Sequence, residues 1–413
     1  MAVTQARLDR YRAELDDLGE AAFSFVDGFL RAIVADEPGI SVAELREAAI
    51  DAVDSSLHAF GDQASELALD LFEEIVAHGH GLEVDAAIED AIPEEMVEGG
   101  VRYAARKLLD GDTGAFRRYV ADLSRYYVKR SAFENMERNC HRNDLRYARV
   151  PSGRETCSFC FMLCSRGFVY RSEQTAGHAH SYHENCDCVV VPGFKDLPAS
   201  GQIEGYDPDG MYERWKACLN TVGGEKALRE EWDAMGKELR AGYKGNNDPE
   251  RYRRFVNAKA MREIETRDWR WLYTGRAPTI TFETTELELE TKKERPQEIK
   301  TAGRLRKFGI APDFAVDSIC FVDEETGFVK RIGLADFASG YEIKTLESAT
   351  SYNTINGYLK NTSKKKNAKY VCFDNSSGVI DDEALIGHLT RSRSFRRGRV
   401  YIIDSKGSYR FIR

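Results

Sequence analysis

Acidic and basic side chains with catalytic potential gather near position 340. Asp336 precedes a Ser-Gly turn, and Glu342 and Lys344 follow that turn in the alternating stretch Tyr341–Thr345. Residues two apart in a strand point to the same face, so we expect Glu342 and Lys344 side by side, with Asp336 across the hairpin. Ionisable groups this close shift one another's pKa, as acid–base chemistry requires. An exposed cross-strand ion pair is the alternative for so short a motif.

A polar segment and two runs of cations follow this motif. Residues 351–356 (Ser-Tyr-Asn-Thr-Ile-Asn) predict a helix start whose hydroxyls, including that of Thr354, and free amide N–H groups suit a phosphate. Neutralised phosphates supply most of the affinity for a nucleic acid, so the cations indicate a nucleic-acid surface; a solvated basic surface is the alternative. The cations are Lys360, Lys364, Lys365, Lys366, Arg391, Arg393, Arg396, Arg397 and Arg399.

Cysteine and histidine residues cluster between positions 157 and 188. A Cys-x-x-Cys pair is followed about 20 residues later by His-x-x-Cys-x-Cys, a spacing typical of a zinc site. A closed shell of four protein ligands would be structural, because a catalytic zinc needs an open position. Disulfides and reduced, packed cysteines are the alternatives, although synthesis in a cytoplasm argues against early disulfides. The candidate ligands are Cys157, Cys160, His183 and Cys186, and Cys188 could replace either of the last two.

The elements that must position these residues divide the chain into four parts. Residues 1–150 carry apolar residues at helical spacing and predict an all-α domain. Residues 151–245 hold the Cys/His cluster, a zinc-type subdomain, and further helix. Residues 246–295 have the turn chemistry and composition of a linker. Residues 296–413 predict a small α+β domain, which makes the chain multidomain.

Strands and helices are predicted to alternate in the C-terminal part. Short runs rich in β-branched and aromatic residues predict strands, and amphipathic runs predict helices. The predicted strands are 314–322, 328–337, 341–345, 369–374, 399–404 and 408–412. The predicted helices are 297–308, 351–366 and 381–394.

Charge is distributed unevenly along a chain whose net charge is −9. Residues 1–100 hold 24 Asp and Glu against 5 Arg, a net charge of −19. Residues 360–413 hold 13 Lys and Arg against 5 Asp and Glu, a net charge of +8, which indicates different partners for the two ends. No run of about 18 apolar residues exists, so we expect no membrane-spanning helix. The polar first residues are no secretory signal, so we expect synthesis in a host cytoplasm.

Three motifs occur in order between positions 149 and 215. They are Arg149-Val-Pro-Ser-Gly-Arg-Glu-Thr-Cys157-Ser-Phe-Cys160, His183-Glu-Asn-Cys186-Asp-Cys188 and Tyr206-Asp-Pro-Asp-Gly-Met-Tyr-Glu-Arg-Trp215. Together they resemble phage minor capsid proteins of the head-morphogenesis, or MuF-like, group over about residues 1–235. The resemblance implies a helical protein held in few copies inside the virion, next to portal and capsid proteins. Such proteins often carry C-terminal effector domains.

A second set of motifs lies in the C-terminal part. It comprises Glu298-Ile-Lys-Thr301-Ala-Gly-Arg-Leu305, Asp336-Phe, Tyr-Glu342-Ile-Lys344-Thr and Thr354-Ile. These resemble the C-terminal toxin domains of contact-dependent-inhibition proteins, which are tRNA-cleaving nucleases of the barnase, EndoU, colicin and RelE-like group. Two departures are a Lys-rich run (364–366) where a Gln is common and a longer insert at 317–330.

The toxin resemblance implies metal-free RNA cleavage, in which the 2′-hydroxyl attacks its own phosphate. Glu342 would act as the base beside Asp336. Lys344 and Arg393 would stabilise charge on the phosphorane, and Thr354 would hold a phosphate oxygen. The substrate would be RNA, with tRNA as one candidate. The candidate RNA-binding residues are Lys360, Lys364, Arg391, Arg397 and Arg399.

Two alternatives stay open. Asp336 with Glu342-x-Lys344 also resembles metal-dependent PD-(D/E)XK nucleases, in which two carboxylates hold Mg²⁺ and the lysine orients water. Pro312-Asp313 matches the first half of that motif literally, but Asp336 faces Glu342 across the turn. The other alternative is a structural head protein that contacts packaged DNA without catalysis. For a nuclease we also expect an acidic immunity protein, a place inside the virion and delivery of the C-terminal domain to a target cytoplasm.

Overall fold

The computed structural model describes residues 2–78, 80–89, 92–151, 156–170, 188–194, 196–322, 329–348 and 350–413. These residues form two compact units, Met1–Asp209 and Gly210–Arg413, each described below by itself. The first unit is mostly helical and the second ends in a region of both helices and strands, so the predicted multidomain class with a helical front and an α+β end is confirmed. Among the described helices, none is both long and apolar enough to span a membrane.

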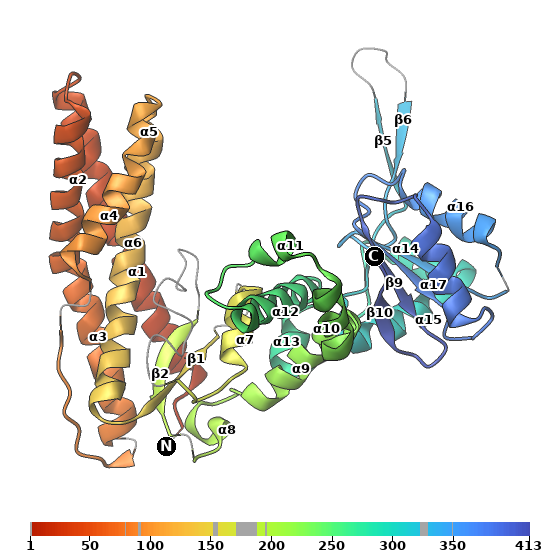
Figure 1. Cartoon of the computed structure of the whole chain (residues 1–413), viewed down its shortest axis with the longest axis horizontal. Coiled ribbons are helices and arrows are strands. Elements are labelled where there is room, and N and C mark those ends of the chain that lie inside the picture. Colours follow the sequence, from red (N-terminus) through yellow and green to blue (C-terminus); the bar gives the residue numbers. More distant parts are fainter. Residues whose placement is uncertain are drawn as a thin grey trace. The chain divides into compact units, whose positions relative to one another are not determined.

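The first unit is built on long helices that lie side by side (Figure 1). Leu8, Tyr11 and Leu15 recur at helical spacing and are buried, which explains why the first helix packs lengthwise on α6. Ser41 and Glu44 form a capping box that starts the second helix. The helical elements are α1 (Gln5–Asp36), α2 (Val42–Ser56), η1 (Leu57–Gly61), α3 (Asp62–Glu73), η2 (Glu74–His78), α4 (Glu94–Ala104), α5 (Arg106–Leu109) and α6 (Thr113–Arg142).

A short hairpin-like ribbon follows the long helices. Strand β1 (Arg146–Val150) pairs antiparallel with β2 (Val189–Gly193), and both are largely buried. The second strand was predicted from its valines. The first was not, because its pairing partner comes about 40 residues later in the chain. The remaining elements of this unit are α7 (Ser158–Cys164), α8 (Ala199–Gln202) and the first residues of α9 (Pro208–Thr221).

The second unit begins with helices that pack around a buried tryptophan, Trp232, which contacts Phe255 and Leu228. Residues 246–295, predicted to be a linker, instead form regular elements that join this unit. The helices of this segment bury only one face, so its composition stays as polar as that of a linker. The elements are α10 (Gly224–Ala234), α11 (Lys237–Ala241), α12 (Asp248–Ile264), α13 (Trp269–Thr274), β3 (Thr281–Phe282) and α14 (Thr285–Glu294).

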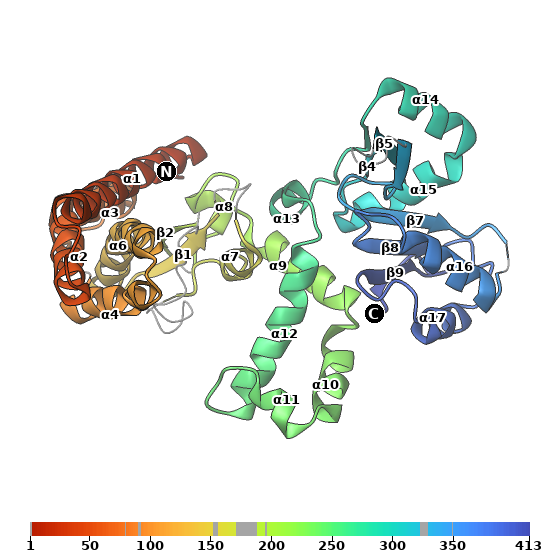
Figure 2. The ribbon, with the colours of Figure 1, turned by 90° about the horizontal axis from the view of Figure 1, so that it is seen from above.

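A four-stranded sheet in the order β10-β9-β8-β7 organises the C-terminal region. The three strands β7, β8 and β9 are parallel, which requires a crossover helix after each of the first two. Helices α16 and α17 supply these crossovers and cover one face, whereas α15 covers the other (Figure 2). The elements are α15 (Pro296–Leu305), β7 (Tyr341–Thr345), α16 (Tyr352–Thr362), β8 (Tyr370–Asp374), α17 (Asp382–Arg391), β9 (Arg399–Ile403) and β10 (Tyr409–Phe411).

Smaller elements lead into the first strand of this sheet. The 3₁₀ turn η4 (Arg306–Phe308) extends α15, and β4 (Asp313–Phe314) pairs in parallel with β3. The antiparallel strands β5 (Ser318–Val322) and β6 (Val329–Gly333) form a ribbon that projects from the region (Figure 1). The sequence prediction merged β4 with β5, but the strands of the main sheet match their predicted positions within one residue at each end.

Candidate functional site

Four charged side chains converge where the chain enters β7: two from this strand, one from the turn before it and one from the segment after α16. Lys344 Nζ lies 2.6 Å from Glu342 Oε1, and Lys365 Nζ lies 2.6 Å from Glu342 Oε2. The Lys365 ammonium is also 3.5 Å from Asp336 Oδ1. The backbone N–H of Ile343 donates to Asp336 Oδ2 at 2.8 Å, which fixes this carboxylate against the strand. The β7 periodicity and the turn before it therefore bring the three predicted residues together, and the chain after α16 adds Lys365.

The two carboxylates of this cluster are buried, so water does not solvate their negative charges. The Glu342 side chain is only 2% exposed, and Asp336 is buried as well. Burial, followed by the charge of Glu342, raises the pKa of Asp336. Burial alone would lower the pKa of Lys344, but Asp336 and Glu342 outweigh it, so the pKa of this lysine is raised. Lys344 therefore stays charged and offsets part of the negative charge of the two carboxylates.

A third carboxylate, Glu298 on α15, belongs to the same electrostatic environment. Burial and the nearby charge of Asp336 raise the pKa of Glu298 to about 7, although Arg295 and Lys344 act in the opposite direction. The guanidinium of Arg295 lies 3.6 Å from Glu298 Oε2 and 3.2 Å from Asp317 Oδ1. Glu298 can thus exchange a proton near neutral pH, which is the range useful for general acid–base work.

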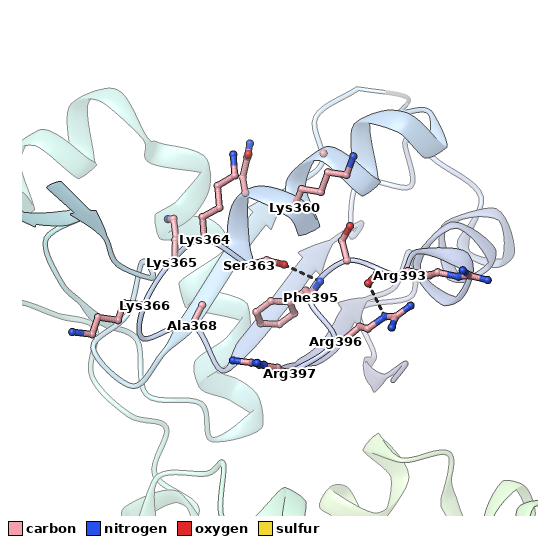
Figure 3. A pocket seen from close by; sticks show the side chains of 13 residues that line it. Lys360, Ser363, Lys364, Lys365, Lys366, Ala368, Arg393, Phe395, Arg396 and Arg397 are labelled. Atoms are coloured by element: carbon pink, nitrogen blue, oxygen red, sulfur yellow. Dashed lines mark hydrogen bonds between the residues drawn. The ribbon is translucent and has the colours of Figure 1, made fainter. Parts of the chain in front are cut away.

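A basic cavity of about 1020 Å³ adjoins the cluster. Its walls come from the end of α16 with the residues that follow, and from the loop before β9; these two sets of cations lie on different sides of Phe395 (Figure 3). Among the described residues, no Asp or Glu lines this cavity. Lys365 belongs to both the cavity and the cluster. The cationic lining residues are Lys360, Lys364, Lys365, Lys366, Arg393, Arg396 and Arg397.

An unusual backbone conformation shapes the arginine side of the cavity. Phe395 has φ +58°, a left-handed value that is strained for an aromatic residue. Its ring is buried in the core under α16 and α17, and its N–H donates to Ser363 Oγ at 2.8 Å. Packing and this hydrogen bond hold the strained turn, and such strain gathers at functional sites. The turn directs Arg393, Arg396 and Arg397 to the cavity.

The structure separates the other predicted site residues. Thr354 lies in the first turn of α16, whereas Lys365 and the carboxylates lie at the opposite end of this helix, about 15 Å away at 1.5 Å per residue. Arg393 lines the cavity together with Lys360, Lys364 and Arg397. These four therefore face a common space, and Thr354 does not share it.

Two of the predicted RNA-binding residues are engaged elsewhere. Arg391 Nε donates to the carbonyl of Gly387, and its guanidinium lies 5.4 Å from the ring centre of Tyr352. Arg399 pairs with the fully buried Glu263 on α12. Arg399 therefore ties helix α12 to the sheet, a structural role that the sequence prediction did not include.

Sequence reasoning gave Glu298 no role and placed Lys365 only in a basic surface, not beside the carboxylates. Glu298 is part of one of the motifs given above. Its position on the buried face of an amphipathic helix could have indicated a carboxylate that is shielded from water. Lys365 is one of three adjacent lysines in the sequence. Of these three, it alone forms an ion pair with a described carboxylate. Sequence spacing could not distinguish it, because its partners lie 23 and 29 residues away.

The Cys/His cluster is only partly within the described residues. His183 and Cys186 lie outside them, whereas Cys157, Cys160 and Cys188 are described. The N–H of Cys160 donates to Cys157 Sγ at 3.3 Å, and Cys188 Sγ accepts from Arg149 Nη2 at 2.9 Å. Within the described part of the chain, no group of three or more His, Cys, Asp or Glu side chains is arranged to hold a metal ion. The zinc site stays a prediction.

Comparison with known proteins identifies the front of the chain. No solved structure matches it. The "Gene 15 protein" of Mycobacterium phage D29 is 36% identical over 76 residues, with 12% of this chain and 28% of that relative covered. The chain therefore spans well under two thirds of that relative's length. The family model described as VG15 protein matches residues 2–218, more than half of the chain. This protein thus belongs to the VG15 family of phage proteins.

Proposed function

We propose that this phage protein is a virion component whose C-terminal α/β region is a nuclease. One observation carries the proposal: the Asp336, Glu342 and Lys344 cluster adjoins a cavity whose charged lining residues are all cations. A nucleic acid presents a repeated negative charge that such a lining would neutralise. Phosphodiester chemistry needs charged groups next to the place where the backbone binds, and the cluster supplies them.

The geometry favours the metal-dependent alternative over metal-free cleavage. In the metal-free mechanism Glu342 must accept a proton, but each of its oxygens already accepts from a lysine, and Thr354 lies at the far end of α16. Asp336 Oδ1 and Glu342 Oε2 instead flank one positive charge, the Lys365 ammonium. Two hard carboxylate oxygens suit Mg²⁺, which keeps several waters and is often bound through one or two carboxylates.

The chain's own residues have separate tasks in this proposal. Asp336 and Glu342 would hold the divalent cation, which when bound would polarise a phosphoryl oxygen and activate water. Lys344, paired with Glu342 at the rim of the site, would orient the attacking water and stabilise charge on the phosphate. The cationic side chains that line the cavity would bind the neighbouring phosphates of the nucleic-acid backbone. Glu298, with its raised pKa, would donate or accept a proton near neutral pH.

The test uses the purified full-length chain. Labelled RNA and DNA are incubated with wild type, Glu342→Gln and Lys344→Met, with Mg²⁺ or with EDTA. Lys406→Met, at an exposed lysine in the turn between β9 and β10, is the matched control. We expect cleavage by wild type and control, loss of it in both site variants and loss on EDTA addition. Thermal melts confirm that each variant is folded.

Each other outcome has a defined meaning. Cleavage that persists in EDTA but disappears in both variants would restore the metal-free RNase mechanism. Cleavage by both variants would remove the chemistry from this site. Absence of cleavage and of toxicity on expression in a bacterial host would favour the non-catalytic alternative, in which the basic cavity contacts packaged DNA.

For the helical front, we propose a head-morphogenesis role of the MuF-like kind, with portal and capsid proteins as partners. Membership of a phage family and the extended helices of the first unit support this proposal. We also propose a structural zinc at the Cys/His cluster, because the N–H to Sγ bond in the Cys157–Cys160 turn orients a thiol as a metal ligand requires. An acidic immunity protein would neutralise the nuclease before its delivery to a target cytoplasm.

A further inference from the structure

Lys365 differs from the other cations of the basic cavity. Its Nζ lies between Glu342 Oε2 and Asp336 Oδ1, and its side chain is 21% exposed. The remaining cavity cations are exposed, and among the described residues none of them forms an ion pair with a carboxylate. Lys365 therefore carries the charge that connects the cavity to the carboxylates.

We propose that Lys365 is a positioning residue that exchanges partners when nucleic acid binds. In the free protein its ammonium neutralises Glu342 and Asp336. When a sugar-phosphate backbone enters the cavity, the ammonium turns to a phosphate and leaves the two carboxylates open to the chemistry. The inference rests on the proposed nuclease function, since it takes a nucleic-acid backbone as the ligand of the cavity.

The ion pair that remains between Lys344 and Glu342 limits the energetic cost of this exchange. Removing one partner of a buried ion pair is costly when the other charge is left alone. Glu342 would not be left alone, because Lys344 Nζ remains 2.6 Å from its other oxygen. A lysine is a point charge on a flexible four-carbon stem, so it can change partners through side-chain rotation, without movement of the backbone. A phosphate in the cavity would offer it an equivalent anionic partner.

The exchange predicts a specific coupling between two residues in nucleic-acid binding. Wild type must withdraw Lys365 from Glu342 in order to bind phosphate, whereas Glu342→Gln releases the lysine in advance. Glu342→Gln should therefore tighten binding about tenfold, which is the effect of losing one charge-assisted hydrogen bond in the free state. In a Lys365→Gln background this gain should shrink to the small effect of removing one nearby negative charge.

A double-mutant cycle on the full-length chain measures this coupling. The probe is a fluorescent 2′-O-methyl RNA of about 12 nucleotides in EDTA, which neither proposed mechanism cleaves. The four proteins are wild type, Glu342→Gln, Lys365→Gln and the double variant. The matched cycle replaces Lys365→Gln by Lys364→Gln, because Lys364 lines the same cavity but forms no ion pair with a described carboxylate. Lys365→Arg keeps the charge and should keep the coupling.

The outcomes separate this inference from the function on which it rests. Non-additivity with Lys365 and additivity with Lys364 would support the exchange. An equal effect of Glu342→Gln in both Lys365 backgrounds would overturn it, while binding by wild type would leave the nuclease proposal standing. Failure of wild type to bind the probe even at low salt would overturn the proposed nucleic-acid cavity itself. If Glu342→Gln does not fold, Asp336→Asn replaces it in the same cycle.

Discussion

Replacement of Glu298 by glutamine should stabilise the protein above neutral pH and leave its stability unchanged in acid. Burial and Asp336 raise the pKa of this carboxyl from 4.5 to about 7. Below pH 4.5 it is protonated in both the folded and the unfolded chain. Between about pH 4.5 and 7 the folded chain binds more protons than the unfolded chain, so the unfolding free energy falls as pH rises. Glutamine cannot ionise and escapes this loss.

The size of the effect follows from the shift. A pKa raised from 4.5 to about 7, at about 1.36 kcal/mol per pKa unit, sets an upper limit of about 3.4 kcal/mol above pH 7. The side chain is 16% exposed, so solvent screening lowers the expected gain to about 1–2 kcal/mol. For a unit of about 200 residues this corresponds to an increase in Tm of about 2–8 °C.

Calorimetric melts at pH 4 and pH 8 test this prediction on wild type, Glu298→Gln and the exposed control Glu294→Gln. We expect Glu298→Gln to melt higher than wild type at pH 8 and at the same temperature at pH 4. The control should follow wild type at both values. An equal gain at both pH values would point to better packing rather than to proton linkage. No gain at pH 8 would refute the assigned electrostatic cost.

Three further predictions concern other parts of the structure. Glu263→Ala leaves the buried Arg267 without its carboxylate partner, so urea denaturation should show a loss of about 3–5 kcal/mol; a loss below about 1 kcal/mol would contradict this. Lys360→Gln should reduce the slope of log affinity for nucleic acid against log salt by about one, whereas Arg399→Gln should not; equal slopes would argue against the assigned cavity. Cys157→Ser should lower the zinc content per chain in elemental analysis, and an unchanged content would contradict the proposed zinc site.

The C-terminal strands were predictable because their signals are local. The runs at 341–345, 369–374 and 399–404 combine β-branched and aromatic residues with turn residues on both sides, and the structure has strands there. The same two-residue period placed Glu342 and Lys344 together, and their side chains form an ion pair. The helix positions were equally predictable, because N-cap residues such as Ser351 and Asp381 can be identified from a few neighbouring residues.

Contacts between distant residues were not predictable in this way. Lys365 meets Glu342 only because α16 returns antiparallel to β7, so that a helix C-terminus lies over a strand start. The antiparallel direction of α16 also separates Thr354 from the carboxylates, although Thr354 is closer to them in sequence than Lys365 is. Arg399 looked like a surface cation because its partner, Glu263, lies 136 residues earlier in a segment predicted to be a linker.

The tie between α12 and the sheet determines how the C-terminal region can be separated from the rest. Glu263 accepts from Arg399 and from the hydroxyl of Tyr401, and Arg267 lies over the ring of Tyr409. A fragment that began at residue 296 would lose Glu263 and Arg267 and would open an aromatic face of the sheet to water. A cut that leaves the C-terminal region intact must therefore lie ahead of residue 248, and an expression fragment should start at the boundary near residue 210.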